Sequence, residues 1–151
     1  MIGAILAKKN VRSAFDALSL QNLDAFLNYW ADQAIFLCPG PSGPGFAEQV
    51  VRIEGKEAIR GWFEAFVGQW EYATFMVKNV SVKRMCPLAV GDNVIMVEWD
   101  LLLKSRDMAK DINTSGVAVI DVTNGKAIEV RVYECLGNPL FLSEGFMTGE
   151  A

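Results

Sequence analysis

The sequence predicts an α+β fold in which helices pack on one face of an antiparallel β-sheet. Apolar residues recur at helical spacing in the first part of the chain, whereas segments rich in Val and Ile, separated by turn signals, fill it from about residue 73 onward. Helices that come first and strands that come last are typical of this class. The length of 151 residues corresponds to one domain, 1–151, with 1–9 as an N-terminal extension and 137–151 as a C-terminal tail.

Three segments carry the apolar spacing of an amphipathic helix. The first is marked by Val11, Phe15 and Leu18, and the second runs over 23–30. Asn22, directly before the second segment, is a residue type that caps helix N-termini. The third segment has five apolar positions on one face. These positions are Ile59, Trp62, Phe63, Phe66 and Val67.

Two short strands and four long ones complete the predicted elements. The short strands are 34–38, which Pro39 ends, and 50–53. The dipeptide Asn124-Gly125 predicts a tight hairpin turn between the last two long strands. The four long strands cover residues 74–84, 93–104, 114–123 and 127–136.

Composition excludes several classes of function. The chain contains no histidine, which excludes catalysis by Ser-His or Cys-His pairs and metal sites built on imidazole. The net charge is −4 and the pI is about 4.8. The longest basic runs are Lys8-Lys9 and Lys83-Arg84, whereas nucleic-acid binders cluster many more Lys and Arg residues. A nucleic acid is therefore not expected as a partner.

The cysteines and the apolar segments bear on the cellular compartment. Cys38, Cys86 and Cys135 are far apart and form no Cys-x-x-Cys motif, so neither a disulfide framework nor a metal site is expected. Reduced thiols favour a cytoplasmic protein. The longest uncharged stretch, 33–47, contains three prolines, so no membrane span is expected, and residues 1–7 lack the pattern of a signal peptide.

Two sets of polar residues on the predicted strands are candidates for chemistry. Glu98 and Asp100 are two residues apart, so their side chains share one face, as an acid–base pair or a solvated strand surface would require. On the last strand, Arg131, Tyr133 and Cys135 share a face. Tyr133 can donate a hydrogen bond to a ligand. Cys135 is a nucleophile only as a thiolate, and no His or Lys lies nearby in the sequence to favour that form.

Several short runs, in this order and spacing over about residues 10–136, resemble the nuclear transport factor 2-like superfamily. The closest branch contains SnoaL-like proteins, ketosteroid isomerase and limonene epoxide hydrolase. The resemblance implies a curved antiparallel sheet wrapped like a cone around three helices, an apolar internal pocket and a homodimer. The runs are Phe15-Asp-Ala-Leu, Asn22-Leu-Asp-Ala-Phe, Trp30-Ala-Asp-Gln-Ala-Ile-Phe, Glu54-Gly-Lys-Glu-Ala-Ile-Arg-Gly-Trp-Phe, Val97-Glu-Trp, Asn124-Gly-Lys and Ile128-Glu-Val-Arg-Val-Tyr.

The same resemblance indicates that the acid–base groups of these enzymes are missing here. Apolar or thiol side chains occupy the corresponding positions, so whether the protein is an enzyme stays open. A shift of one residue at Trp99 would instead turn Glu98 and Asp100 inward. The positions are Ala14, Cys38 and Ala118 for ketosteroid isomerase, and Trp99, Leu101 and Cys135 for limonene epoxide hydrolase.

The resemblance predicts a mostly apolar pocket, as is usual for small-molecule sites. Tyr133, Cys135 and Asp100 are the catalytic candidates, and neither a cofactor nor a metal is expected. The residues expected to bind the ligand are Phe36, Cys38, Trp62, Phe66, Trp99, Leu101 and Ala118.

The sequence is compatible with three functions. The first is a SnoaL-like protein that binds a small apolar molecule. The second is a divergent isomerase, cyclase, dehydratase or epoxide hydrolase acting on a polyketide-, steroid- or terpenoid-like substrate. The third is a dimerisation module whose interior is filled by its own side chains. The apolar segment 139–146 is expected to close the pocket or to contact a partner subunit.

Overall fold

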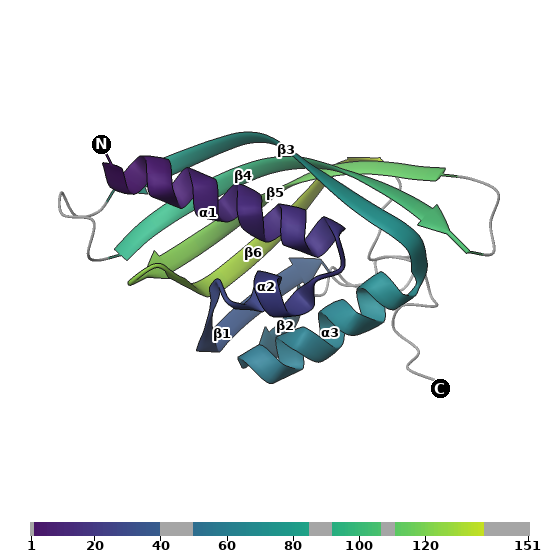
Figure 1. Ribbon diagram of the computed structural model, residues 1–151, viewed down its shortest axis with the longest axis horizontal. Helices are drawn as coiled ribbons and strands as arrows, with labels where there is room; N and C mark the ends of the chain where they lie inside the picture. Colours follow the sequence, from purple (N-terminus) through teal and green to yellow (C-terminus); the bar gives the residue numbers. More distant parts are fainter. Residues whose placement is uncertain (1, 40–49, 85–91, 107–110, 138–151) are drawn as a thin grey trace.

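The computed structural model describes residues 2–39, 50–84, 92–106 and 111–137. Figure 1 shows a curved, open sheet with helices on one of its faces, which confirms the α+β class. The helices are α1 (Ile2–Ser19), α2 (Leu23–Leu27) and α3 (Lys56–Gly68). The strands are β1 (Trp30–Pro39), β2 (Val50–Glu54), β3 (Trp70–Arg84), β4 (Asp92–Ser105), β5 (Asp111–Thr123) and β6 (Lys126–Gly137).

The strand order in the sheet is β2-β1-β6-β5-β4-β3. Strands β3 to β6 pair antiparallel with their sequence neighbours, and so do β1 and β2. The pair β1–β6 is parallel, which corrects the prediction of a wholly antiparallel sheet. A short turn forces antiparallel pairing, whereas most of the chain separates β1 from β6 and permits the parallel direction.

Two local signals in the sequence have the predicted effect. The side-chain oxygen of Asn22 accepts a hydrogen bond from the backbone N–H of Ala25 at 3.1 Å and so caps α2. Asn124 and Gly125 have positive φ angles of 50° and 78° and join β5 to β6. Such a turn matches the twist of the two strands, which is why Asn-Gly predicts a hairpin.

The helix predicted over 23–30 is shorter in the structure. It ends at Leu27, and Trp30 begins β1, where it pairs with Ala127 of β6. The Trp30 ring packs edge-on against Phe26, at a centroid distance of 5.6 Å. Helical spacing was misleading here because the first residue of a strand faces the same core as the helix before it.

Other boundaries also differ from those predicted. Residues 2–9, expected to be an extension, form the first half of α1. Strands β3 and β5 begin at Trp70 and Asp111, earlier than expected. In β5 the added residues include Asp111 and Asn113, which are residue types that strands disfavour. The segment 139–146 lies outside the described residues.

Helix α1 runs along β3, the last strand of the sheet in this order. The Ser19 hydroxyl accepts a hydrogen bond from the backbone N–H of Phe75 at 2.8 Å and donates to the carbonyl of Phe15 at 3.0 Å. Two turns earlier, the Arg12 guanidinium donates to the carbonyl of Val77 at 3.1 Å. Side chains of α1 therefore satisfy backbone groups that an edge strand would otherwise leave without a partner.

Replacing Ser19 tests this contact. We expect Ser19→Ala to lower the free energy of unfolding by about 1–3 kcal/mol, because the Phe75 N–H loses its partner. The measurement is denaturant unfolding at equilibrium. Ser13→Ala, the same change on the same helix, is the control and should cost less than about 0.5 kcal/mol. Equal losses for the two variants would contradict the role of Ser19.

Candidate functional site

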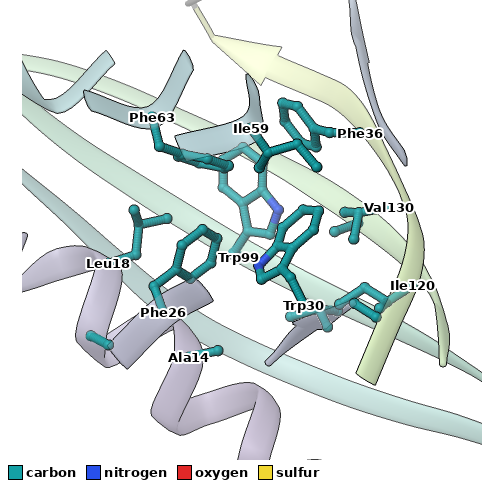
Figure 2. Close-up of a cluster of buried hydrophobic side chains, with 14 of the residues drawn as sticks. Ala14, Leu18, Phe26, Trp30, Phe36, Ile59, Phe63, Trp99, Ile120 and Val130 are labelled. Atoms are coloured by element: carbon teal, nitrogen blue, oxygen red, sulfur yellow. The ribbon is translucent and has the colours of Figure 1, made fainter. Parts of the chain in front are cut away.

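A cavity of about 200 Å³ lies between the helices and the face of the sheet that they cover. Among the residues that the structure describes, none with a charged side chain lines it. Figure 2 shows Trp30 and Trp99 in the middle of the buried cluster, with side chains of the helices on one side and those of the sheet on the other. The aromatic residues that line the cavity are Phe15, Phe26, Tyr29, Trp30, Phe36, Trp62, Phe63, Phe66, Phe75 and Trp99.

Aromatic contacts join α3 to β1 along one wall of the cavity. The rings of Phe36 and Trp62 have centroids 4.9 Å apart, and Trp62 stacks on Phe66 at 5.7 Å with an interplanar angle of 5°. Phe63 packs edge-on against Phe26 of α2 at 4.8 Å. Each such pair contributes about 0.5–1.5 kcal/mol beyond area burial, so this wall is held together as a unit.

The alternation along β4 decides which of its side chains face the cavity. Trp99 and Leu101 are 3% and 1% exposed and line the cavity. Glu98 and Asp100 lie on the opposite face, where both carboxylates meet the Lys78 ammonium at 3.7 and 3.4 Å. Lys78 is the extra residue at a register shift in β3, so a β-bulge brings this lysine to the two acids.

Asp100, a catalytic candidate from the sequence, is therefore outside the cavity. Its side chain is 38% exposed and paired with Lys78. The register in which Glu98 and Asp100 point inward does not occur, because Trp99 pairs with Gly116 and Val97 with Ala118 on the buried face. The physical reason is burial: the indole belongs in the core, and two unpaired carboxylates do not.

The last strand separates its polar residues from the cavity in the same way. Val130 and Val132 line the cavity, whereas Tyr133 is 52% exposed on the other face. On that outer face Arg131 pairs with Asp121 at 2.6 Å and with Glu129. These two carboxylates raise the pKa of the Arg131 guanidinium, through hydrogen bonds to Asp121 first. The cluster is a surface ion pair of the sheet rather than part of the cavity.

Cys135 lies in β6, but its side chain is outside the described residues. In the backbone, Gly116 pairs with Glu134 and Ser115 with Leu136, so Cys135 is the extra residue of a β-bulge. A bulge bends and twists the strand that carries it. The structure thus places Asp100 and Tyr133 outside the cavity, and Cys135 as a catalytic candidate stays a prediction.

Of the predicted ligand-binding residues, all but Cys38 line the cavity. Cys38 is 2% exposed and pairs with Val51 of β2, and it is not among the lining residues. Burial raises the pKa of its thiol to about 12, so the group stays protonated at neutral pH. The residues that do line the cavity are Phe36, Trp62, Phe66, Trp99, Leu101 and Ala118.

Three polar residues that line the cavity were not predicted from the sequence: Asn10, Tyr29 and Asn93. For two of them, the sequence contains a pattern that indicates an inward side chain. Asn10 belongs to the apolar stripe of α1 that continues through Val11 and Ala14, and Asn93 begins the inward-facing alternation of β4. Tyr29 lies in the turn between α2 and β1, where no periodic pattern marks an inward side chain. Within the described residues, no group of three Cys, Asp or Glu side chains could hold a metal ion.

The model of the SnoaL-like domain family matches residues 11–130. The chain belongs to this family. A proposed isomerase from Bacillus subtilis is 20% identical to this SnoaL-like protein, with a TM-score of 0.68 over 97% of this chain and 96% of that one. A proposed scytalone dehydratase from Novosphingobium aromaticivorans DSM 12444 is 10% identical, with a TM-score of 0.70 over 91% of each chain.

A third similar structure is a protein of ketosteroid isomerase-like fold from Catenulispora acidiphila DSM 44928, solved in complex with trimethylamine. It is 11% identical, with a TM-score of 0.65 over 84% of this chain and 85% of that one. At such identities the likeness shows the fold alone. A search of curated proteins gave no match. No helix within the described residues combines the length and apolar character that crossing a membrane requires.

The raised pKa of Cys38 makes a testable difference to thiol chemistry. In a Cys86→Ser/Cys135→Ser variant at pH 8, Cys38 should react with a disulfide reagent about a thousandfold more slowly in the folded than in the unfolded protein. Reaction is followed by absorbance, with the guanidinium-unfolded chain as control. Similar rates in the two states would contradict burial of the thiol.

The same pKa shift predicts a loss of stability in alkali. The thiol of a free cysteine has a pKa of about 8.5, so above that pH the unfolded chain releases the thiol proton while the folded chain retains it. Stability is therefore full below about pH 8.5 and falls as the pH rises toward 12. Denaturant unfolding between these pH values should show a shallower decline for Cys38→Ala. An unchanged decline in this variant would exclude Cys38 as its source.

Proposed function

We propose that this SnoaL-like protein binds a small, neutral and mostly apolar molecule in the cavity between its helices and sheet. The observation that carries the proposal is the 200 Å³ cavity itself, whose described lining contains aromatic and aliphatic side chains and no charge. A dimerisation module with a filled interior would need Phe36, Trp62 and Trp99 to occupy this space. They line it instead, which favours a ligand site.

The polar lining residues indicate how a ligand would be oriented. Asn93 pairs with Val122, Val122 pairs with Ala127, and the Ala127 N–H donates to the Tyr29 carbonyl at 2.8 Å. Asn93 and Tyr29 therefore lie at the same end of the sheet, near the N-terminal half of α1 (Figure 1), which carries Asn10. A ligand with one polar group is expected to direct that group to this end and its apolar part toward α3.

Binding is favoured over the isomerase, cyclase, dehydratase and hydrolase alternatives by the chemistry of the lining. The groups that most often transfer protons in enzymes are imidazoles, carboxylates and amines, and none of these lines the described part of the cavity. The polar side chains of the described lining are two amides and one phenol. They can hold a polar atom of a ligand by hydrogen bonds, which is a binding role.

Blocking the cavity tests the proposal. We expect p-cresol, a neutral single-ring probe, to bind the wild-type protein and to stabilise it by about 2.7 kcal/mol at 100 times its Kd. Ala118→Ile adds side-chain volume to the cavity wall and should lower the affinity by about tenfold or more. Calorimetric titration and thermal unfolding measure the two effects.

The matched control is Val117→Ile, the neighbouring position of β5. Val117 pairs with Glu98 and Tyr133 on the face away from the cavity, so this variant should bind p-cresol like the wild type. A wild-type protein that binds neither p-cresol nor any other neutral single-ring probe would overturn the proposed function. Equal losses of affinity in both variants would place the probe elsewhere.

We also propose that the protein forms a homodimer through the outer face of its sheet. No described helix covers this face, and it exposes 48% of Met76, 51% of Met96 and 52% of Tyr133. The Lys78 ammonium between Glu98 and Asp100 lies on the same face. Exposed apolar side chains with charged groups around them are typical of a surface that a second subunit covers.

The oligomeric state of a charged variant tests this surface. Met96→Asp puts a carboxylate in the middle of the outer face, and we expect it to convert a dimer to a monomer in analytical ultracentrifugation. Leu20→Asp changes an apolar residue that is 79% exposed at the end of α1 and should leave the dimer intact. A wild-type monomer at high concentration would refute the proposed assembly.

A further inference from the structure

We propose that Trp99, packed against Gly116, sets the size limit of the cavity and restricts it to ligands with a single ring. The inference rests on the proposed ligand-binding function. Trp99 of β4 and Gly116 of β5 pair directly across the two strands, and the backbone alternation turns both toward the cavity side of the sheet. The indole lies over Gly116, where any other residue would have a side chain.

The fit between the indole and the glycine leaves no room for a methyl group. A Cβ at Gly116 would lie 2.5 Å from Cζ2 and 2.7 Å from Cη2 of Trp99, and 2.7 Å from the carbonyl oxygen of Tyr133. Two carbon atoms in van der Waals contact are about 3.5–4.0 Å apart, so the indole would have to move by roughly 1 Å. Since the Cβ projects from β5 toward the interior, that movement carries the ring away from the sheet and into the cavity.

The neighbours of this pair hold the indole in place. Glycine in a strand marks a close approach or a bend, and β6 carries its Cys135 bulge beside Gly116. On its other side, Trp99 meets the Phe75 ring edge-on at a centroid distance of 5.6 Å. Trp99 is thus held between the backbone of β5 and the side chain of Phe75, and the remaining space above it is the cavity.

The volume of that space defines the ligand class. An apolar cavity of about 150 Å³ holds benzene, and sites for drug-sized molecules have about 300–1,000 Å³. The cavity of about 200 Å³ therefore matches one six-membered ring with a few substituents. Fused multi-ring molecules need more room than Trp99 leaves in this position.

The experiment compares one-ring and two-ring probes of the same chemistry, p-cresol and 2-naphthol, by calorimetric titration. Wild-type protein should prefer p-cresol by about tenfold or more. Trp99→Phe removes the outer ring atoms that lie over Gly116. This variant should bind 2-naphthol about tenfold more tightly than the wild type does, while its affinity for p-cresol changes little. Gly116→Ala should lower the affinity for p-cresol by about tenfold, because the indole moves into the space that p-cresol occupies.

Two further variants make the test specific to this contact. In the double variant Gly116→Ala/Trp99→Phe, the shorter phenyl ring no longer reaches the new Cβ, whereas the Tyr133 carbonyl oxygen still meets it, so p-cresol binding should recover in part. Gly61→Ala on α3, where a Cβ meets no atom within 4 Å, is the control for a glycine substitution. If Gly116→Ala fails to fold, Trp99→Phe alone still decides the inference through its effect on probe size.

The possible outcomes separate this inference from the proposed function. Binding of p-cresol together with an unchanged size preference in Trp99→Phe would overturn the role of Trp99 and leave the ligand site intact. Absence of binding by both probes to every variant would remove the proposed function, and the inference with it. A size preference that changes in Trp99→Phe, together with p-cresol binding that Gly116→Ala weakens and the double variant recovers, supports both.

Discussion

The packing of the Trp99 indole on the backbone of Gly116 is the contact on which the interior of this protein depends. It requires β4 to face the core with its odd-numbered residues, which places Trp99 inside and Glu98 and Asp100 outside. It also requires a residue without a side chain on β5. With the indole against Gly116, the sheet, the aromatic wall of α3 and β1, and helix α1 enclose a space instead of a filled core.

The same alternation along the strands determines where the charged side chains lie. The described ion pairs of the long strands lie on the outer face or at the strand ends, as in the Lys78 pairs and the Arg131 cluster. A carboxylate inside the cavity would need a partner or a raised pKa, and the described lining supplies no cation. The interior therefore suits neutral ligands, and the polar surface groups that resemble catalytic residues in the sequence act as structural ion pairs.

Helix α1 links the stability of the sheet to the shape of the cavity. Its Ser19 and Arg12 side chains bond to the backbone of β3, while other residues of the helix, including Val11 and Ala14, form one wall of the cavity. Loss of these bonds would loosen the strand edge and the wall together. A ligand that contacts α1 and the sheet at once is expected to stabilise this arrangement, because it adds contacts that only the folded state offers.

The sequence by itself determined the α+β class, the cap at Asn22 and the turn at Asn124-Gly125, because these follow from local conformation and from the alternation of apolar residues. The resemblance to the family supplied six of the residues that line the cavity. The sequence also showed that histidine chemistry is absent. Only the tertiary structure decided the parallel pairing of β1 with β6, the outward direction of Asp100 and Tyr133, and the absence of Cys38 from the described cavity lining. These depend on strand register and on bulges such as the one at Lys78, where one extra residue changes the face that a side chain occupies.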